Sequence, residues 1–196
     1  MNKTRHFRTS DLTCLQTVVA FRVIHSAPYS RLAMASTDFK QQLALVTGAT
    51  GGIGRATVLA LAGLGCPVAI HYHSAAETAK ELVAQLREAG VQATPFQANL
   101  STYEDARKLH REVVEQMGHP TVLFNNAGLT MGKSGVKDVS EVSIEDFEST
   151  WRSNCGTAFL LTQLCMPAMV EKGWGRVIFN SSVAGFTGGV VGPHYA

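Results

Sequence analysis

The fold class follows from one stretch, LALVTGATGGIGRATVLALAGLG, which spans residues 43–65. Its first six residues, 43–48, form a short apolar run, which is typical of a strand buried on both faces of a parallel sheet. A glycine-rich segment follows at 48–54, and then comes a run with helical character. A glycine motif is informative when it joins a strand to a helix in this order. The stretch therefore predicts a strand, a nucleotide-binding turn and a helix.

Each glycine of this motif has a distinct expected role. Gly48 permits the tight turn, Gly52 lets the backbone approach a pyrophosphate, and Gly54 lets the helix pack close to the strand. The helix that follows offers unpaired N–H groups to phosphate oxygens. Glycines also serve ordinary turns, so it is the flanking strand and helix that favour nucleotide binding.

Strands and helices continue to alternate after this first unit. The pattern predicts strands at 67–73, 93–100, 121–128 and 175–182, and helices at 75–90, 103–118 and over much of 143–172. Such alternation indicates parallel pairing with right-handed crossovers. We therefore expect an α/β protein with a doubly wound parallel sheet, the Rossmann fold.

Composition and charge exclude several classes of function. The chain has 196 residues, 45% of them hydrophobic, and a net charge of +2. Residues 1–37 hold five of the 17 basic residues and one of the 15 acidic residues, which leaves 12 and 14 in the remainder. This mildly acidic body predicts no nucleic-acid partner. No apolar run is long enough to cross a membrane. The four cysteines lack metal-ligand spacing, so we expect no metal site and a reducing, intracellular compartment.

The first 37 residues differ in character from the rest of the chain. They are rich in Arg, Ser and Thr and poor in acids, which fits either an organelle transit peptide or a disordered extension. We therefore expect an N-terminal extension at 1–37 outside the fold and a nucleotide-binding domain at 38–196. The corresponding location is cytoplasmic, or mitochondrial if residues 1–33 are a transit peptide.

Several motifs together carry a family resemblance. TGATGGIG (47–54), NNAG (125–128), Asn154, Ser182 and Tyr195 occur in the order and spacing of the short-chain dehydrogenase/reductase family. Over residues 40–196 the chain most resembles the 3-oxoacyl-carrier-protein reductase type. The glycines also fit the TGxxGxxG spacing of the extended branch of the family, and NNAG favours the ordinary short branch.

The resemblance implies a role for three side chains. Tyr195 would give its phenolic proton to the developing alkoxide, Ser182 would hydrogen-bond the substrate oxygen, and Asn154 would hold a water in a proton relay. Each also has a structural interpretation: a packed aromatic, a strand-end cap and a buried amide with satisfied hydrogen bonds. The implied reaction is hydride transfer between a nicotinamide and a carbonyl or acyl-thioester substrate.

The resemblance also implies which residues contact the cofactor. These are Thr47, Gly48, Thr50, Gly52, Ile53, Gly54, Tyr72, His73, Ser74, Asn99, Leu100, Asn126, Ala127 and Gly128. NAD-preferring sites usually carry an acid at the end of the second strand, where this chain has HYHS and no carboxylate before Glu77. We therefore expect NADP(H) to be favoured over NAD(H). Asn99 stands where the family usually has an aspartate, and its amide oxygen is still an acceptor for the adenine amino group.

One residue of the family pattern lies beyond Ala196. In the family, a lysine one helical turn after the tyrosine lowers the pKa of that phenol and grips the nicotinamide ribose. We therefore expect this chain to be a truncated reductase with an incomplete sheet and an exposed parallel edge, whose full-length form is a homo-oligomer. The alternative is a catalytically inactive nucleotide-binding fragment or interaction module.

Overall fold

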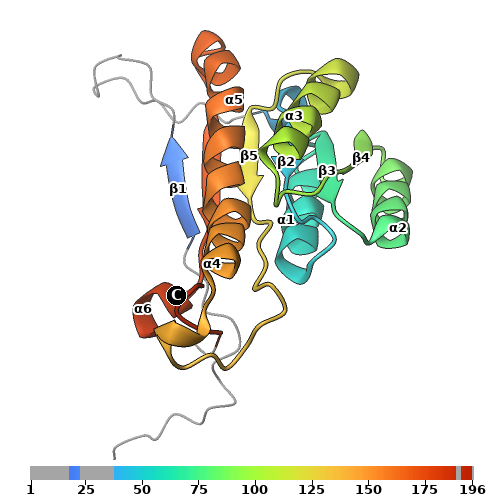
Figure 1. Cartoon of the computed structure of the whole chain (residues 1–196). Coiled ribbons are helices and arrows are strands. Elements are labelled where there is room, and N and C mark those ends of the chain that lie inside the picture. Colours follow the sequence, from blue (N-terminus) through green and yellow to red (C-terminus); the bar gives the residue numbers. More distant parts are fainter. Residues whose placement is uncertain (1–17, 23–37, 189–190, 196) are drawn as a thin grey trace, which may run out of the picture.

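A six-stranded sheet forms the middle layer of the protein (Figure 1). The computed structural model describes residues 18–22, 38–188 and 191–195. The strands are β1 (Val18–Arg22), β2 (Ala44–Val46), β3 (Val68–Tyr72), β4 (Ala93–Gln97), β5 (Val122–Asn125) and β6 (Arg176–Asn180). The helices are α1 (Gly52–Gly63), α2 (Ala76–Glu88), α3 (Tyr103–Met117), α4 (Ile144–Trp151), α5 (Thr157–Glu171) and α6 (Ala184–Thr187), with short turns η3 (Phe39–Gln41), η4 (Val139–Glu141) and η5 (Arg152–Gly156).

The order of the strands confirms the doubly wound arrangement. The sheet runs β1-β6-β5-β2-β3-β4, and the five strands β2 to β6 are parallel to one another. The chain winds from β2 toward β4 on one side and from β5 toward β6 on the other. The carboxyl ends of β2 and β5 therefore flank the point where the winding reverses, which is where open α/β sheets bind their ligands.

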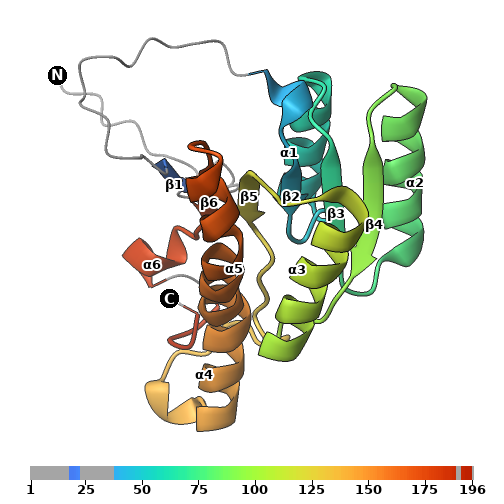
Figure 2. The same ribbon diagram turned by 90° about the horizontal axis from the view of Figure 1, so that it is seen from above.

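Helices cover both faces of this sheet (Figure 2), with α1 and α2 on one side and α3, α4 and α5 on the other. Successive strand residues point to opposite faces, so Leu45 packs toward α3 and α5 while Val46 packs toward α1 and α2. Both residues are fully buried. Because both faces of the strands are buried, successive residues in their sequences are apolar. None of the described helices combines the length and apolar character needed to cross a lipid bilayer.

The N-terminal extension contributes one strand to the sheet. Residues Val18–Arg22 form β1, which pairs antiparallel with β6 from Val18 opposite Asn180 to Arg22 opposite Arg176. For these five residues the expectation that the extension lies outside the fold is wrong, and so is the expected exposed edge at β6. The rest of that extension, 1–17 and 23–37, lies outside the described residues, as does the transit-peptide interpretation.

The long helix expected over 143–172 is interrupted. Residues 152–156 form a turn of π-helix, η5, between α4 and α5. Gly156 ends this turn, and a Cβ at that position would collide with the phenol of Tyr103 on α3. The phenol of Tyr103 therefore fills the space beside Gly156, and a side chain there would force the phenol to move. A π-turn of this kind often re-aims a functional side chain, and here η5 carries Asn154.

Candidate functional site

The glycine turn after β2 adopts a conformation that requires glycine. Gly48 has φ +62°, in the left-handed region, and a Cβ there would lie 3.1 Å from the Cα of Ala127 and from Nδ2 of Asn126. Either condition alone disfavours a side chain, because L-residues are strained at positive φ and the space is already filled. The sequence-based role of Gly48 as the tight-turn residue agrees with this geometry.

The first turn of α1 combines a tight contact with an open one. A Cβ at Gly54 would collide with the carbonyl oxygen of Gly48 and lie 2.8 Å from the Cα of Ala49, so α1 packs directly on the turn. A Cβ at Gly52 would meet no described atom within 4 Å. Gly51 caps the helix without a described side-chain hydrogen bond. The first turn of α1 therefore leaves open space beside Gly52, an arrangement that can receive a phosphate.

Two polar side chains tie the ends of β2 and β5 together. The hydroxyl of Thr47 donates to the carbonyl of Phe124 (3.2 Å) and accepts from the N–H groups of Asn126 (2.8 Å) and Ala127 (2.9 Å). In return, Nδ2 of Asn126 donates to the carbonyls of Thr47 (2.9 Å) and Gly48 (3.2 Å). The residues TG of the first motif and NA of the second are thus one hydrogen-bonded unit, although about 80 positions separate them.

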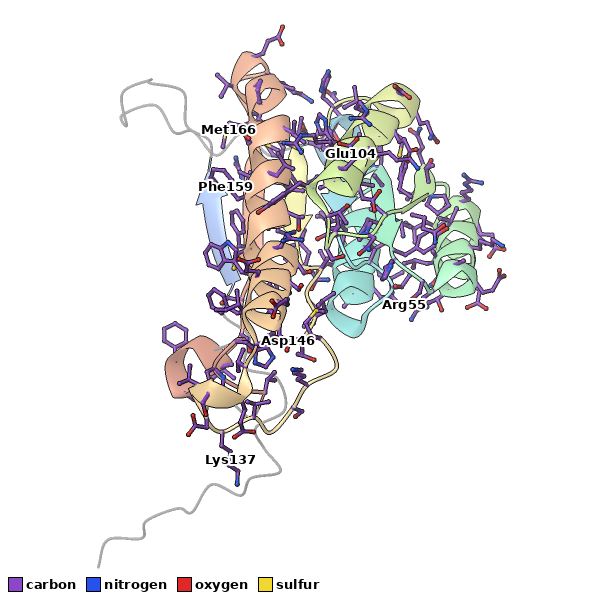
Figure 3. All side chains as sticks on the ribbon, viewed as in Figure 1. Arg55, Glu104, Lys137, Asp146, Phe159 and Met166 are labelled. Carbon is purple, nitrogen blue, oxygen red and sulfur yellow. The ribbon has the colours of Figure 1, made fainter. Side chains whose placement is uncertain are left out.

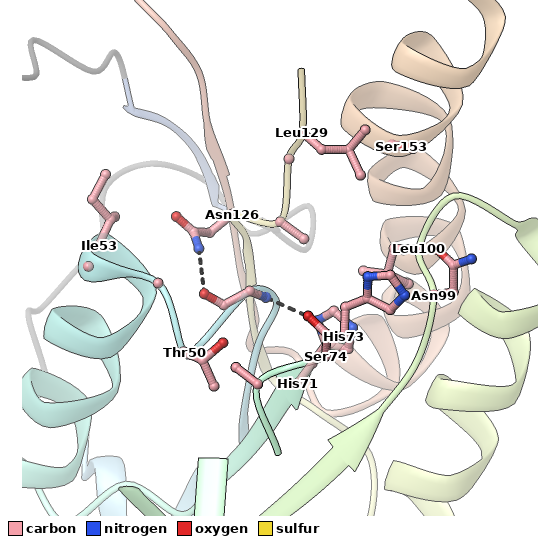
Figure 4. A pocket seen from close by; sticks show the side chains of 16 residues that line it. Thr50, Ile53, His71, His73, Ser74, Asn99, Leu100, Asn126, Leu129 and Ser153 are labelled. Atoms are coloured by element: carbon pink, nitrogen blue, oxygen red, sulfur yellow. Dashed lines mark hydrogen bonds between the residues drawn. The ribbon is translucent and has the colours of Figure 1, made fainter. Parts of the chain in front are cut away.

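A cavity of about 440 Å³ opens at these strand ends (Figure 4). Its described lining comes from the glycine turn, the ends of β3 and β4, the segment after β5 and η5. The lining residues are Gly48, Thr50, Gly51, Gly52, Ile53, His71, His73, Ser74, Ala75, Asn99, Leu100, Asn126, Ala127, Gly128, Leu129 and Ser153. The cavity therefore gathers five segments that are remote in sequence at one edge of the sheet.

Most of the predicted cofactor residues fall in this lining, and a few do not. Thr47, Gly54 and Tyr72 are not among the lining residues: Thr47 is buried in the hydrogen-bonded unit, and Gly54 belongs to α1 and is buried against the glycine turn. Five lining residues were not expected from the sequence, namely Gly51, His71, Ala75, Leu129 and Ser153. The one signal for these five residues in the sequence is that they lie next to predicted site residues.

The end of β3 presents no carboxylate to the cavity. His73 and Ser74 are exposed there, and none of the described lining residues is Asp or Glu. The nearest carboxylate in sequence, Glu77, pairs with Lys80 at 2.8 Å on α2. Arg55 on α1 donates from Nη2 to Oε1 of Gln85 on α2 at 3.2 Å (Figure 3). Its guanidinium therefore stabilises the contact between two helices and does not line the cavity.

Asn99 is engaged by its own turn. Its Oδ1 accepts from the backbone N–H of Ser101 (3.1 Å) and from the hydroxyl of Ser101 (2.7 Å). Both lone pairs of that oxygen are thereby used, so the group that Asn99 offers to the cavity is the Nδ2 donor. The expectation that its amide oxygen receives an adenine amino group therefore does not fit this geometry.

His71 is a buried imidazole within the cavity wall. Only 2% of its surface is exposed, Nδ1 accepts from the N–H of Gly48 (3.0 Å), and Nε2 lies 3.1 Å from the carbonyl oxygen of Ala98. Burial lowers the pKa of His71 from 6.5 to about 4. The ring is therefore neutral near pH 7, although it borders a cavity with an opening to solvent.

Asn154 lies on η5 and forms two hydrogen bonds with the segment after β5. Its Oδ1 accepts from the N–H of Leu129 (2.8 Å) and its Nδ2 donates to the carbonyl of Leu129 (2.9 Å). This pair of hydrogen bonds agrees with the structural interpretation of Asn154 as an amide whose hydrogen bonds are satisfied within the protein. The amide retains a second lone pair and a second N–H, which are the groups a bound water would use.

The other two expected catalytic residues follow β6. The Oγ of Ser182 accepts from the N–H of Ala184, the first residue of α6, at 3.2 Å. Tyr195 is half-buried in a turn in which its N–H donates to the carbonyl of Gly192 at 3.0 Å. Neither residue is among the described lining of the cavity. No described hydrogen bond joins either of them to Asn154.

The lining of the cavity determines which ligand groups it can bind. The open N-terminus of α1 suits an anion, while the remaining lining combines apolar atoms with amide, hydroxyl and imidazole groups that suit a nucleoside. Across the described ranges, no three metal-ligating side chains gather at one point. A dinucleotide held by its phosphates at the glycine turn fits this lining.

Comparisons with known proteins support the same interpretation. Residues 42–196 match the family model of short chain dehydrogenases. The chain is 34% identical over 152 residues to the 3-oxoacyl-[acyl-carrier-protein] reductase of Synechocystis sp., covering 78% of this chain and 60% of the relative. It is 35% identical over 148 residues to the acetoacetyl-CoA reductase of Allochromatium vinosum, covering 75% and 58%. The chain thus spans about three fifths of the length of the curated relatives it matches.

Solved structures show the same likeness. The NADH-dependent reductase A1-R′ responsible for alginate metabolism aligns with a TM-score of 0.70 and 27% identity, over 81% of this chain and 65% of that one. A blue fluorescent protein from a metagenomic library, in complex with NADPH, aligns with a TM-score of 0.62 and 31% identity, over 67% and 53%. With its glycine turn, its strand order and its match over residues 42–196, the chain belongs to the short-chain dehydrogenase family.

Proposed function

We propose that this chain binds NADP(H) and serves hydride transfer between the nicotinamide and a carbonyl or hydroxyl group of a small substrate. The observation that supports this most is the cavity at the ends of β2 and β5. The uncapped N-terminus of α1 and the open space beside Gly52 fit a pyrophosphate there. The bound nicotinamide would supply or accept the hydride.

The preference for the phosphorylated cofactor rests on the end of β3. A ribose 2′-phosphate is repelled by a carboxylate at this place, and His73 and Ser74 present none. Solved relatives point both ways, since one was determined in complex with NADPH and another is NADH-dependent. The absence of a carboxylate from the described lining favours the first type.

The substrate class we propose is a 3-oxoacyl thioester, as used in fatty acid metabolism. Two relatives at 34% and 35% identity are named for 3-oxoacyl and acetoacetyl thioesters. In the proposed reaction Tyr195 donates its phenolic proton to the developing alkoxide and Ser182 hydrogen-bonds the same oxygen. Asn154 would hold the water that returns a proton to this site.

Nucleotide binding is tested first and without turnover. NADPH and NADH are titrated into the 196-residue chain at equal ionic strength, because the extra phosphate is a charged contact sensitive to salt. Tighter binding of NADPH supports the proposal. Equal or reversed dissociation constants contradict the cofactor preference, and the absence of binding by both contradicts the function.

Turnover is tested with NADPH oxidation in the presence of 3-oxoacyl thioesters and simple ketones. The 196-residue chain is compared with a version extended beyond Ala196 to include the lysine of the family pattern. We expect far higher activity in the extended version, in which Tyr195→Phe abolishes turnover and Ser182→Ala reduces it severely. If the extended version binds NADPH but reduces none of these substrates, the alternative of a non-catalytic nucleotide-binding module is favoured.

We also propose self-association of the full-length protein through α5. Phe159 is 68% exposed on this helix, and it lines an apolar groove together with Met166, Pro167 and Val170 (Figure 3). A helix face of this kind suits an interface between copies. Phe159→Asp should shift the mass of the extended version, measured by light scattering, toward that of a monomer. An unchanged mass would exclude this face.

A further inference from the structure

We propose that His71 is a positioning residue of the nucleotide site, whose imidazole holds the glycine turn in its binding conformation by accepting the N–H of Gly48. This inference rests on the proposed nucleotide binding and goes beyond it, because His71 was predicted neither as a catalytic residue nor as a cofactor ligand. The dashed lines in Figure 4 show Gly48 held between Asn126 and His71.

Two successive N–H groups of the turn bind to this one residue. The N–H of Gly48 donates to Nδ1 of His71 at 3.0 Å, and the N–H of Ala49 donates to the backbone carbonyl of His71 at 2.9 Å. The second bond would form with any residue at position 71. The first depends on a side-chain acceptor, so the identity of the residue determines whether the N–H of Gly48 is paired.

The partner of the other ring nitrogen defines the tautomer. Nε2 lies 3.1 Å from the carbonyl oxygen of Ala98, which can only accept. Nε2 must therefore carry the hydrogen, and in a neutral imidazole this leaves Nδ1 as the acceptor that Gly48 needs. The low pKa of His71 keeps the ring in this neutral form near pH 7. His73, two residues further along the chain and just after β3, is the titratable group whose charge also lowers the pKa of His71.

These contacts join three parts of the cavity wall. Gly48 belongs to the glycine turn, His71 to β3, and Ala98 directly precedes the lining residues Asn99 and Leu100. A single ring therefore sets the spacing between the turn and the end of β4. An apolar residue would pack equally well among its buried neighbours on β3, but it would leave the N–H of Gly48 without this acceptor.

A shift of Gly48 would not stay local. The carbonyl oxygen of Gly48 accepts from Nδ2 of Asn126 and lies directly against the position where Gly54 would carry a Cβ. Because α1 rests on this contact, a displaced turn displaces the first residues of the helix. The N-cap Gly51 and the first helical residues Gly52 and Ile53 all line the cavity. The ring thus controls the place where the phosphates would bind, although it lies beneath the turn.

Two amide substitutions separate the two hydrogen bonds of the ring. In His71→Asn the amide oxygen takes the approximate place of Nδ1, so the bond from Gly48 is kept and the bond to Ala98 is lost. In His71→Gln the amide nitrogen takes the approximate place of Nε2, so the opposite bond is kept. Ile70→Val serves as the control, because it trims a fully buried neighbour on β3 and touches neither bond.

The experiment measures the dissociation constant of NADPH and the free energy of unfolding for the full chain and each variant. We expect the constant of His71→Asn to stay within about 3-fold of the parent and that of His71→Gln to rise by about 10-fold or more. Ile70→Val should lose stability without losing affinity, which separates positioning from general destabilisation. His71→Leu replaces the Gln variant if that one does not fold.

The possible outcomes are distinct. Equal affinities in the Asn and Gln variants, or weaker binding by a folded Asn variant than by the Gln variant, overturn the proposal. The proposal is also overturned if His71→Leu binds NADPH as tightly as the parent does. If the parent binds neither NADPH nor NADH, the proposed function fails, and this result is recognised before any variant is measured.

Discussion

The side chain of Asn180 donates a hydrogen bond from Nδ2 to Oδ1 of Asn126 at 2.9 Å. Asn126 in turn donates to the carbonyls of Thr47 and Gly48. This chain of amides connects the carboxyl ends of β6, β5 and β2, and Asn126 is also part of the cavity lining. The Asn126 amide acts as donor and acceptor at once, a pairing that no carboxylate can reproduce.

Asn126→Asp should therefore destabilise the protein strongly. The substitution keeps the shape of the side chain but turns its two donations into contacts between a carboxylate oxygen and two carbonyl oxygens. We expect a loss of about 3 kcal/mol in the free energy of unfolding, measured with urea. The matched control is Asn99→Asp, because the oxygen of Asn99 only accepts from Ser101. That change should stay within about 0.5 kcal/mol, and equal losses would contradict the assignment of donors.

Cofactor preference should respond to a charge at the end of β3. Ser74→Asp places a carboxylate where the lining has none, so it should weaken NADPH binding by roughly 10-fold while NADH stays within about 3-fold. Dissociation constants at low and high salt check this, since the repulsion should weaken as salt rises. Ser74→Asn is the neutral control. A parallel loss of both cofactors would place the ribose elsewhere.

Acid should destabilise the fold partly through His71. Its pKa falls from 6.5 to about 4 on folding because the ring is buried, so the unfolded chain binds the extra proton between these values. Stability is therefore lost as the pH falls from 6.5 toward 4, by about 3 kcal/mol in total. Urea unfolding at several pH values should show a shallower decline in His71→Asn than in the parent. Identical slopes would mean that this ring does not titrate in the window.

Asn154 should restrain the segment after β5 even without substrate. Asn154→Leu removes both contacts with Leu129, and we expect the amide of Leu129 to exchange with deuterium at least about 10-fold faster, the equivalent of about 1.4 kcal/mol. Cys155→Ala, at an exposed position of the same π-turn, should leave this exchange unchanged. Unaltered exchange in Asn154→Leu would show that other contacts hold the segment.

Removal of β1 should expose the edge of β6. A version that lacks residues 1–22 should lose roughly 2 kcal/mol, the net value of a few backbone hydrogen bonds, and should aggregate more readily. A version that lacks only residues 1–17 keeps β1 and is the control. Light scattering and urea unfolding distinguish the two. Equal stability of both versions would argue against a contribution from this strand.

The sequence predicted the parallel part of the fold because the determinants there are local. Each predicted strand and helix was found, with ends that mostly differ by one to three residues. Gly48 and Gly54 illustrate this. Gly48 adopts a positive φ, and Gly54 has no room for a side chain. The spacing of the glycine motif predicted glycine at both positions.

The features that the sequence did not predict depend on distant partners. The π-turn η5 lies where Tyr103 packs at Gly156 and where Asn154 bonds Leu129, and both partners are remote in sequence. The acceptor role of His71 depends on a turn 23 positions away. Local periodicity reports which residues are apolar, and it does not report which polar partner a buried side chain will meet.

The pairing of β1 with β6 also has a consequence for the order of folding. The two strands are separated by about 150 residues, so β1 leaves the ribosome long before its partner is synthesised. The parallel strands β2 to β5 can pair during that interval, whereas β1 must wait for the last strand. Contacts that close so long a loop form late and slowly. We therefore expect the first strand in the sequence to be among the last to join the sheet, and its exchange with solvent to report the final step of folding.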